Sequence, residues 1–241
     1  MDQVERQNSG QVDVERGLRT DRILDAAGNL LVSWGYQRIT IGEVARRAGI
    51  GKGTVYLHFP TKEALFLALL TRSAVVLVDA LLRDIDADPT AVSPGRVARF
   101  GYRWLREEPI SRALFTGDTD TLGALAHSPD VAGIPHERDR IVADYFDILR
   151  EHGVARTDAD AEQQCHGFVA LLTGYLLTED SAPVGASAAE TTADFVAGIA
   201  GAAFEPSPAH GTPDPAAQQV RALLHRTLDR LHHQLSRQLA F

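Results

Sequence analysis

The sequence predicts an all-α protein in which a small N-terminal three-helix domain, built on a helix-turn-helix, precedes a larger helical domain. Three observations predict this class. Apolar residues recur at helical spacing along most of the chain, Pro and Gly separate the periodic segments, and no segment alternates apolar and polar residues as a strand does. We find no internal repeat and no Gly-rich phosphate loop.

The composition is that of a soluble globular protein. The chain has 241 residues, of which 44% are hydrophobic and 23% are charged. A single cysteine, Cys165, excludes a disulfide within the chain and a Cys-rich metal site. Residues 1–17 do not resemble a signal peptide, and no apolar run approaches the ~18 residues of a membrane span. We therefore expect a cytoplasmic protein without a membrane partner.

Charge is distributed unevenly along the chain. Between Arg16 and Lys62 there are eight basic and three acidic residues, a net charge of +5, whereas the rest of the chain carries −13. A basic N-terminal quarter on an acidic body is typical of a small DNA-contacting module carried by another domain.

Capping residues and apolar spacing predict where the first helices begin and end. Residues 1–17 are polar and predict a disordered N-terminal arm. Thr20 is placed to cap a first helix, which continues to Trp34 with apolar residues at helical spacing. Thr40 and Glu43 form the T-x-x-E pattern of a capping box, and Gly49 is placed to end that second, short helix.

A third helix is predicted from about 52 to 59, where Pro60 discourages its continuation and Thr61 can cap a fourth helix over 61–85. This gives a helix-turn-helix domain over 18–66. The fourth helix is apolar on more than one side, so we expect two different neighbours to cover it.

The remainder of the chain reads as a second helical domain over 67–204. Helices are predicted at about 94–107, 109–127, 134–152, 158–179 and 187–204. A Pro-rich linker follows at 205–215, and the segment 216–241 forms a last amphipathic helix. That helix carries an apolar stripe, made of Val220, Leu223, Leu224, Leu228, Leu231, Leu235 and Leu239.

The third helix has an outward face suited to a major groove. Val55 and Phe59 define its buried side, which places Gly53 and Leu57 nearly opposite. Lys52 and Tyr56 then lie on one flank, and Thr54 and His58 lie on the other. Gly53 permits close backbone approach, Leu57 can contact a thymine methyl, and Lys52 can donate to a guanine edge. Thr54, Tyr56, His58 and Lys62 can bind phosphates, as can the amide end of the second helix at Thr40.

The run from Thr40 to Leu65, TIGEVARRAGIGKGTVYLHFPTKEAL, resembles the DNA-binding domain of the TetR family of bacterial transcriptional repressors. The resemblance covers roughly residues 18–66. It implies DNA contacts at Thr40, Gly51, Lys52, Gly53, Thr54, Tyr56, Leu57, His58 and Lys62. Some relatives carry a base-reading Arg in the second helix where this chain has Gly42, so base reading should fall almost wholly on the third helix, with the arginines of the N-terminal arm as a further candidate.

The resemblance also implies a regulatory domain that dimerises and binds a small molecule. A helix-turn-helix normally reads two half-sites, which independently favours a homodimer. Small residues in the helices at 158–179 and 187–204 favour a four-helix dimer interface there, with the 216–240 helix as a competing candidate. Aromatic and polar residues on 94–179 are candidates for the pocket, although each taken singly fits a core position better: Tyr102, Trp104, Phe115, His127, Tyr145, Phe146, His166, Phe168 and Thr173.

No catalytic or metal site is predicted. Cys165 and His166 are adjacent and point about 100° apart on a helix, which disfavours a nucleophile pair. No carboxylate joins His225, His232 and His233 at ligand spacing. We therefore expect a protein that is not an enzyme and needs no cofactor.

The leading hypothesis is a homodimeric regulator, a repressor released from a palindromic operator by a small-molecule effector. The first alternative is a constitutive DNA-binding regulator without a ligand. A helical enzyme would need an acid and a base facing one cavity, and we find no such pair. A protein-interaction scaffold would tolerate Lys52→Ala and Tyr56→Ala without loss of function.

Overall fold

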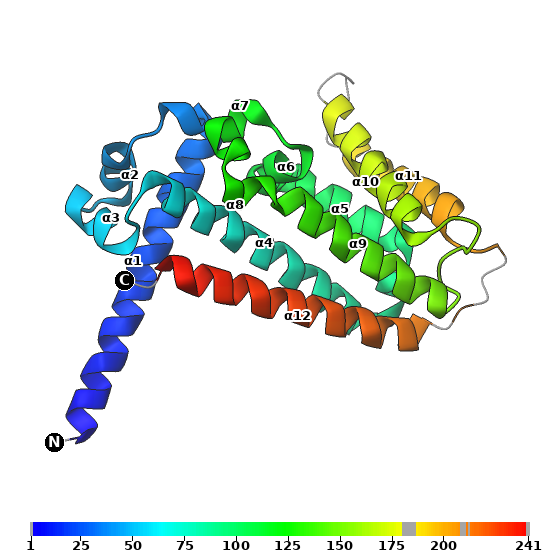
Figure 1. Ribbon diagram of the computed structural model, residues 1–241, viewed down its shortest axis with the longest axis horizontal. Helices are drawn as coiled ribbons and strands as arrows, with labels where there is room; N and C mark the ends of the chain where they lie inside the picture. The colour runs from blue at the N-terminus through cyan, green and yellow to red at the C-terminus, as the bar shows by residue number, and fades with distance from the viewer. Residues whose placement is uncertain (1, 180–186, 208–210, 212, 240–241) are drawn as a thin grey trace.

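The computed structural model describes the backbone of residues 2–179, 187–207, 211 and 213–239, with side chains described from Glu15 and, after the gap, from Glu190. Every regular element among these residues is a helix, which confirms the predicted all-α class. The molecule is elongated. The helix-turn-helix lies at one end and the larger helical domain extends away from it (Figure 1).

The DNA-binding domain consists of α1 (Asp2–Trp34), η1 (Tyr36–Arg38), α2 (Ile41–Ala48) and α3 (Lys52–His58), together with the first turns of α4 (Lys62–Ala87). Their buried side chains form one core, which we call the DNA-domain core; it includes Ile23, Leu31, Val44, Val55 and Phe66. This core also contains Ala113 and Leu122 from the larger domain. The two domains therefore share packed surface.

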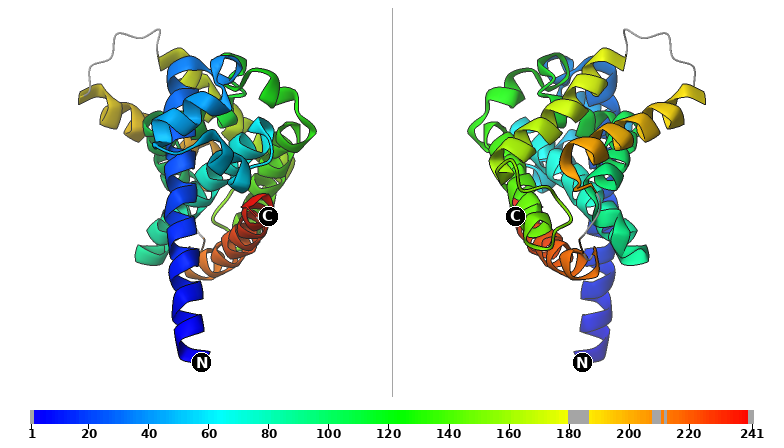
Figure 2. Two further views of the ribbon diagram at one scale, coloured as in Figure 1. Left: turned by 90° about the vertical axis from the view of Figure 1, so that its left-hand side faces the viewer. Right: turned by 90° about the vertical axis from the view of Figure 1, so that its right-hand side faces the viewer.

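Helix α1 differs from the expectation for the N-terminus. The predicted disordered arm at 1–17 is wrong from Asp2 onward, because α1 runs as helix from Asp2 and projects beyond the body of the molecule (Figure 2). Thr20 consequently lies inside the helix and does not cap it. Extending an existing helix costs far less than nucleating one, and residues 2–19 contain no Pro.

The larger domain begins with α4 and continues through η2 (Pro89–Val92), α5 (Pro94–Glu107), α6 (Pro109–Thr116), α7 (Thr119–Leu122), η3 (Gly123–His127), α8 (Pro129–Ala132) and α9 (Ile134–Glu151). It ends with α10 (Ala161–Thr178), α11 (Ser187–Phe204) and α12 (Pro213–Leu239). A second cluster, which we call the regulatory core, includes Leu82, Tyr102, Phe146, Phe168 and Leu224.

The predicted helix at 109–127 is wrong as a single element, because the chain there forms α6, α7 and η3. Gly117 ends α6 with φ 70° and ψ 33°, in the left-handed region that favours glycine. The Asp118 carboxylate then accepts from the amides of Asp120 and Thr121 and starts α7. Single-residue caps of this kind override periodicity.

Helix α4 is covered by several neighbours, as its apolar sides predicted. It packs against α1 and α6 near the DNA-binding domain and against α12 along its length. By length and composition α4 is also apolar enough to cross a membrane, with an 18-residue window of mean hydropathy 2.1. The expectation that no apolar run approaches that length is therefore wrong. Other helices bury 39% of this window, at its two ends more than in its middle.

Helix α12 packs back on its own subunit. Its buried residues join the regulatory core, and the helix runs beside α4 from the far end of the molecule to the DNA-binding domain (Figure 1). It begins at Pro213, inside the predicted 205–215 linker. Residues 208–210 and 212 of that linker lie outside the described part of the chain, as do residues 240–241 of the predicted 216–241 segment. Its apolar stripe is used within the subunit, which removes the main argument for α12 as the dimer interface.

Candidate DNA interface

Helices α2 and α3 are set by caps at both ends of the turn between them. The Thr40 hydroxyl accepts from the Glu43 amide at 3.2 Å, and Gly49 ends α2 with φ 68° and ψ 33°. A residue with a Cβ is strained in that conformation. Only half of the predicted capping box is present, because the Glu43 carboxylate accepts from Arg46 at 3.2 Å. The turn therefore orients α3 through the Thr40 cap and Gly49.

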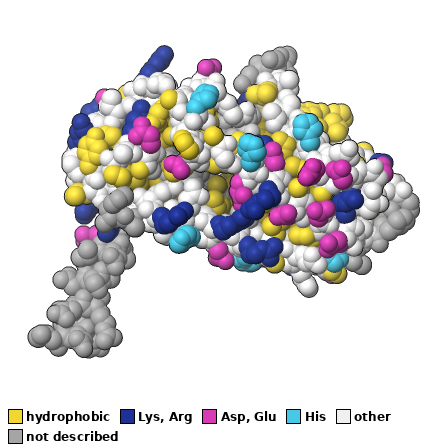
Figure 3. Space-filling model, viewed as in Figure 1, with side chains coloured by type: hydrophobic (Ala, Val, Ile, Leu, Met, Phe, Trp, Pro, Cys, Tyr) yellow, Lys and Arg dark blue, Asp and Glu magenta, His cyan; other side chains and the backbone are white. Residues whose placement is uncertain are grey.

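The outward face of α3 matches its sequence-based description. Val55 and Phe59 are fully buried, whereas Tyr56 is 46% and Leu57 is 71% exposed. A Cβ added at Gly53 would meet no atom within 4 Å, so this part of the helix is open to a close partner. Lys52 is exposed, with its Nζ 5.9 Å from the Tyr56 ring centroid. Space-filling Figure 3 shows hydrophobic side chains beside Lys and Arg at this end of the molecule.

His58 does not lie on this face. Its side chain is buried, and its Nδ1 lies 2.9 Å from the Thr20 hydroxyl of α1. The Thr20 hydroxyl donates its proton to the Arg16 carbonyl at 3.0 Å, so His58 Nδ1–H donates to Thr20. The predicted exposed flank at His58 is therefore wrong. The ring fastens α3 to α1 instead.

The pKa of His58 is lowered, mainly because burial disfavours the charged ring. The positive charges of Arg16 and Arg19 lower it further. The imidazole is therefore held neutral more strongly than an exposed histidine, which suits a structural hydrogen bond.

Lys62 is only half-exposed and binds within the protein. Its Nζ donates to the Tyr36 carbonyl at 2.6 Å and lies 3.9 Å from the centroid of the Tyr36 ring. The Tyr36 hydroxyl donates to Glu63 at 3.1 Å, and burial with that carboxylate raises the pKa of Tyr36 to about 12. Burial lowers the pKa of Lys62. This contact ties the start of α4 to η1, the two elements that flank α2 and α3 in the chain.

The other predicted DNA contacts come together at one end of the domain. Thr40 and Gly51 are exposed at the starts of α2 and α3, and Thr54 is half-buried beside them. Sequence reasoning missed the positioning roles of Thr20 and Tyr36. Neither residue has a local signal for such a role, because each acts on a residue at least 26 positions away.

The predicted ligand-pocket residues do not gather around one cavity. Tyr145, Phe146 and Phe168 pack in the regulatory core, where the Phe146 and Phe168 ring centroids lie 5.7 Å apart. The guanidinium carbon of Arg138 lies over the Phe115 ring, 4.8 Å from the ring centroid. His127 ends η3. The aromatic members of the set mostly fill the core, and a ligand site among the remaining candidates stays a prediction.

Two open grooves involve the rest of the set. A groove of about 700 Å³ between α9 and α10 is lined by His166 and Thr173, together with Arg138 and Asp144. A smaller groove of about 310 Å³ on α5 is lined by Trp104 with Phe100 and Arg103. Among the described residues, no group of three His, Cys, Asp or Glu side chains is placed to hold a metal ion.

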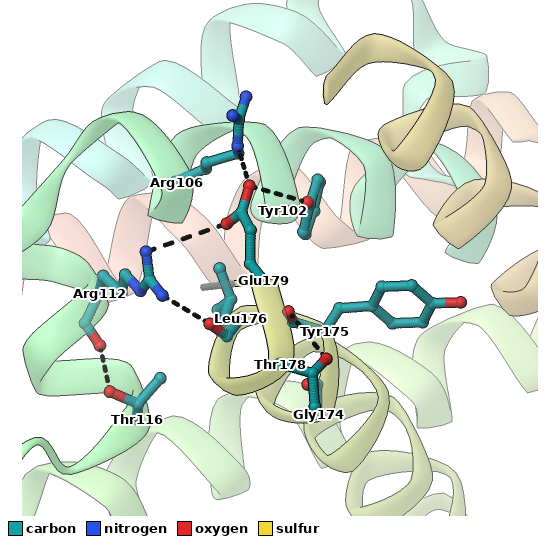
Figure 4. A network of polar contacts seen from close by, with 9 residues as sticks. All are labelled: Tyr102, Arg106, Arg112, Thr116, Gly174, Tyr175, Leu176, Thr178 and Glu179. Carbon is teal, nitrogen blue, oxygen red and sulfur yellow. Dashed lines mark hydrogen bonds and ion pairs between the residues drawn. The ribbon is translucent and has the colours of Figure 1, made fainter. Parts of the chain in front are cut away.

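Tyr102 belongs to a polar network that joins three helices (Figure 4). Glu179, at the end of α10, accepts hydrogen bonds from Arg106 and, at 3.3 Å, from the buried Tyr102 hydroxyl, both on α5. Arg112 on α6 donates to the Leu176 carbonyl at 2.6 Å and lies 3.9 Å from the same carboxylate. The end of α10 is therefore bound to α5 and α6 together.

Residues 23–69 match the family model described as bacterial regulatory proteins, tetR family. The DNA-binding domain of this chain is therefore of the TetR type. The chain is 26% identical over 159 residues to the HTH-type transcriptional regulator YvkB of Bacillus subtilis, which covers 65% of this chain and 80% of that protein. It is 43% identical over 56 residues to the A-factor receptor protein of Streptomyces griseus, which spans 23% of this chain and 20% of the receptor.

The fold of the whole chain is shared by solved structures. One is the transcriptional regulator FadR from Bacillus subtilis in complex with stearoyl-CoA, with a TM-score of 0.56 and 16% identity. That match covers 74% of this chain and 95% of FadR. The predicted resemblance of the N-terminal domain to the TetR family and the predicted fold class are confirmed.

Proposed function

We propose that this protein is a homodimeric repressor that binds a palindromic operator in the cytoplasm and is released by a small-molecule effector. The observation that carries the proposal is the outward face of α3. An exposed Leu57, an open Gly53 and an exposed Lys52 occupy a helix whose other side is fully buried. Leu57 and Tyr56 are exposed next to Lys52 and the open backbone at Gly53, and an apolar strip flanked by hydrogen-bonding groups suits a major groove.

Within that proposal the contacts divide into two kinds. Lys52 donates to a guanine edge and Leu57 contacts a thymine methyl, and these contacts read sequence. Tyr56, Thr54 and the amide end of α2 at Thr40 bind phosphates, which set the register. Lys62 uses one of its three donors on Tyr36, which leaves donors that can bind a phosphate. His58 supports the interface from inside the domain.

Dimerisation is proposed through α10 and α11. Leu177 on α10 is 60% exposed and Phe195 on α11 is 63% exposed, so both helices offer a large apolar side chain to a partner. Gly174 and Gly198 on the same helices have open space where a Cβ would lie, so another helix can approach closely. A symmetry-related pair of these helices would form a four-helix interface.

Release by an effector requires a connection between the domains, and α6 supplies one. The Ile110 Cδ1 atom lies 3.1 Å from the point where a Cβ on Gly28 of α1 would be, so the two helices are in close contact. The Ser111 hydroxyl lies 2.7 Å from the Ser73 hydroxyl on α4. On its other side, Arg112 holds the end of α10. A shift of α10 would therefore move α1 and α4 together, and with them α3.

The names of the relatives support a small-molecule effector. One relative is a receptor for A-factor, and a structural neighbour was solved with stearoyl-CoA bound. A ligand that binds the two states of the dimer differently would change operator affinity by about 5–150-fold. The alternative, a constitutive regulator, predicts no such change with any ligand.

The decisive experiment is selection of binding sites from random double-stranded DNA with the purified protein, followed by gel-shift titration of the selected site. We expect a palindromic site and strong loss of affinity for Lys52→Ala and Tyr56→Ala. Arg226→Ala, an exposed cation on α12, is the matched control and should retain affinity. Failure to enrich any sequence, or equal binding by all three variants, would refute DNA reading by α3.

Two further measurements test the dimer and the effector. Sedimentation should give a dimer, and Phe195→Glu should yield monomers because it places a charge at the proposed interface. For the effector, small molecules are first screened for those that raise the melting temperature of the protein, and these compounds are then added to the gel shift. Stabilising compounds that all leave operator affinity unchanged would favour the constitutive alternative.

A further inference from the structure

Helix α12 contacts the cores of both domains. Its first half is buried in the regulatory core through Ala217, Val220 and Leu224. Near its end, Leu235 and Leu239 pack against the DNA-domain core. One continuous helix therefore connects the far end of the regulatory domain to the domain that carries α3.

Polar contacts fix the first part of this helix in place. Arg221 donates to the Ile85 carbonyl at 2.7 Å and pairs with Asp86 at 2.7 Å, both at the end of α4. Arg230 pairs with Glu137 of α9, also at 2.7 Å. The helix cannot slide or rotate on the regulatory core without breaking these contacts. Its end at Leu235 and Leu239 is therefore held at a defined position.

Helix α4 alone would hold the domains less firmly. Its first turns are buried in the DNA-domain core and Leu82 and Ile85 are buried in the regulatory core, but no residue between 72 and 81 is fully buried. A single helix that is loosely packed in its middle can bend between two cores. A second helix beside it, packed against both cores, opposes that bending.

We propose that Leu235 and Leu239 are specificity-determining residues that fix the half-site spacing accepted by the dimer. By fixing the tilt of each DNA-binding domain on its regulatory domain, they set the separation of the two α3 helices. Each base pair added between half-sites moves them about 3.4 Å apart and rotates one relative to the other, so a rigid dimer accepts one spacing. The inference rests on the proposed dimeric operator binding.

Substitutions at the end of α12 can detach this end from the DNA-domain core without disturbing the rest of the helix. Both leucines are only partly buried, and the buried Gln238 Oε1 has no hydrogen-bond partner among the described residues. The residues that hold α12 on the regulatory core lie at least one turn earlier. Changing the end alone should therefore leave the fold and the dimer intact.

The test uses the full-length protein and the operator selected with it, resynthesised with one or two base pairs inserted or removed at its centre. Wild-type protein should bind the altered spacings at least about 5-fold more weakly than the selected spacing. Leu235→Ser combined with Leu239→Ser should bind all spacings within about 2-fold of one another, because the domains can then reorient. His232→Ser combined with His233→Ser changes exposed residues on the same turns and should keep the wild-type selectivity.

Circular dichroism and sedimentation show whether each variant is folded and dimeric. A protein ending at residue 233 lacks both leucines and provides an independent variant if the double substitution does not fold. Wild-type spacing selectivity in either folded, dimeric variant would overturn the proposal while leaving operator binding established. Absence of any selected operator for the wild type would instead refute the proposed function, and the spacing proposal with it.

Discussion

The contact between Thr20 and His58 is the clearest target for a single substitution. Thr20 is 8% and His58 is 6% exposed, and their side chains join α1 to the recognition helix α3. Thr20→Val keeps the shape of the side chain and removes only its hydroxyl. The substitution therefore leaves the His58 Nδ1–H buried without an acceptor, and it opens no large cavity.

The expected loss follows from that geometry. A buried donor without a partner costs about 1–3 kcal/mol. For a protein of this size, 1 kcal/mol lowers the melting temperature by about 2–4 °C, so a loss of ~2 kcal/mol lowers it by about 4–8 °C. Operator affinity should fall as well, because α3 loses its anchor on α1.

Thermal unfolding followed by circular dichroism at pH 8 measures this loss. Ser33→Ala is the matched control, because the Ser33 hydroxyl also donates to a carbonyl four residues earlier in α1, at 2.8 Å, but is exposed. Its melting temperature should stay within about 1–2 °C of the wild type, as for most surface substitutions. Equal melting temperatures for Thr20→Val and Ser33→Ala would refute the reasoning.

Three other predictions concern single side chains. Leu57→Ala should reduce discrimination at a thymine in the gel shift, yet leave non-specific affinity and the melting temperature nearly unchanged, because Leu57 is 71% exposed; a large stability loss would contradict this. Glu179→Gln should lower the unfolding free energy by about 1–2 kcal/mol in denaturant titration, because Arg106 and Arg112 lose a carboxylate that is only partly screened by water; an unchanged midpoint would contradict it. The pKa of His58 is lowered in the fold, so the unfolded chain binds its proton first, and stability should fall as the pH drops below about 6.5. His58→Gln should show a smaller loss between pH 8 and pH 5.5, and an identical pH dependence would contradict the burial of a neutral ring.

Much of the DNA-binding domain could be predicted from local patterns. The Thr40 cap, the Gly49 terminus and the start of α4 after Thr61 each depend on residues within one or two turns. The opposition of Val55 and Leu57 follows from helical geometry alone. The ligand pocket could not be predicted in this way, because an aromatic residue that fills a core and one that lines a cavity have the same sequence pattern.

The sequence by itself determined the helical class, the turn between α2 and α3 and the exposed strip at Gly53 and Leu57. Only the tertiary structure decided that His58 points inward to Thr20 and that the end of α12 reaches the DNA-binding domain. Caps and periodicity act within one helix and specify where it begins, where it ends and which face is apolar. The neighbour that each face meets depends on contacts between residues far apart in the chain, and local patterns carry no information about those contacts.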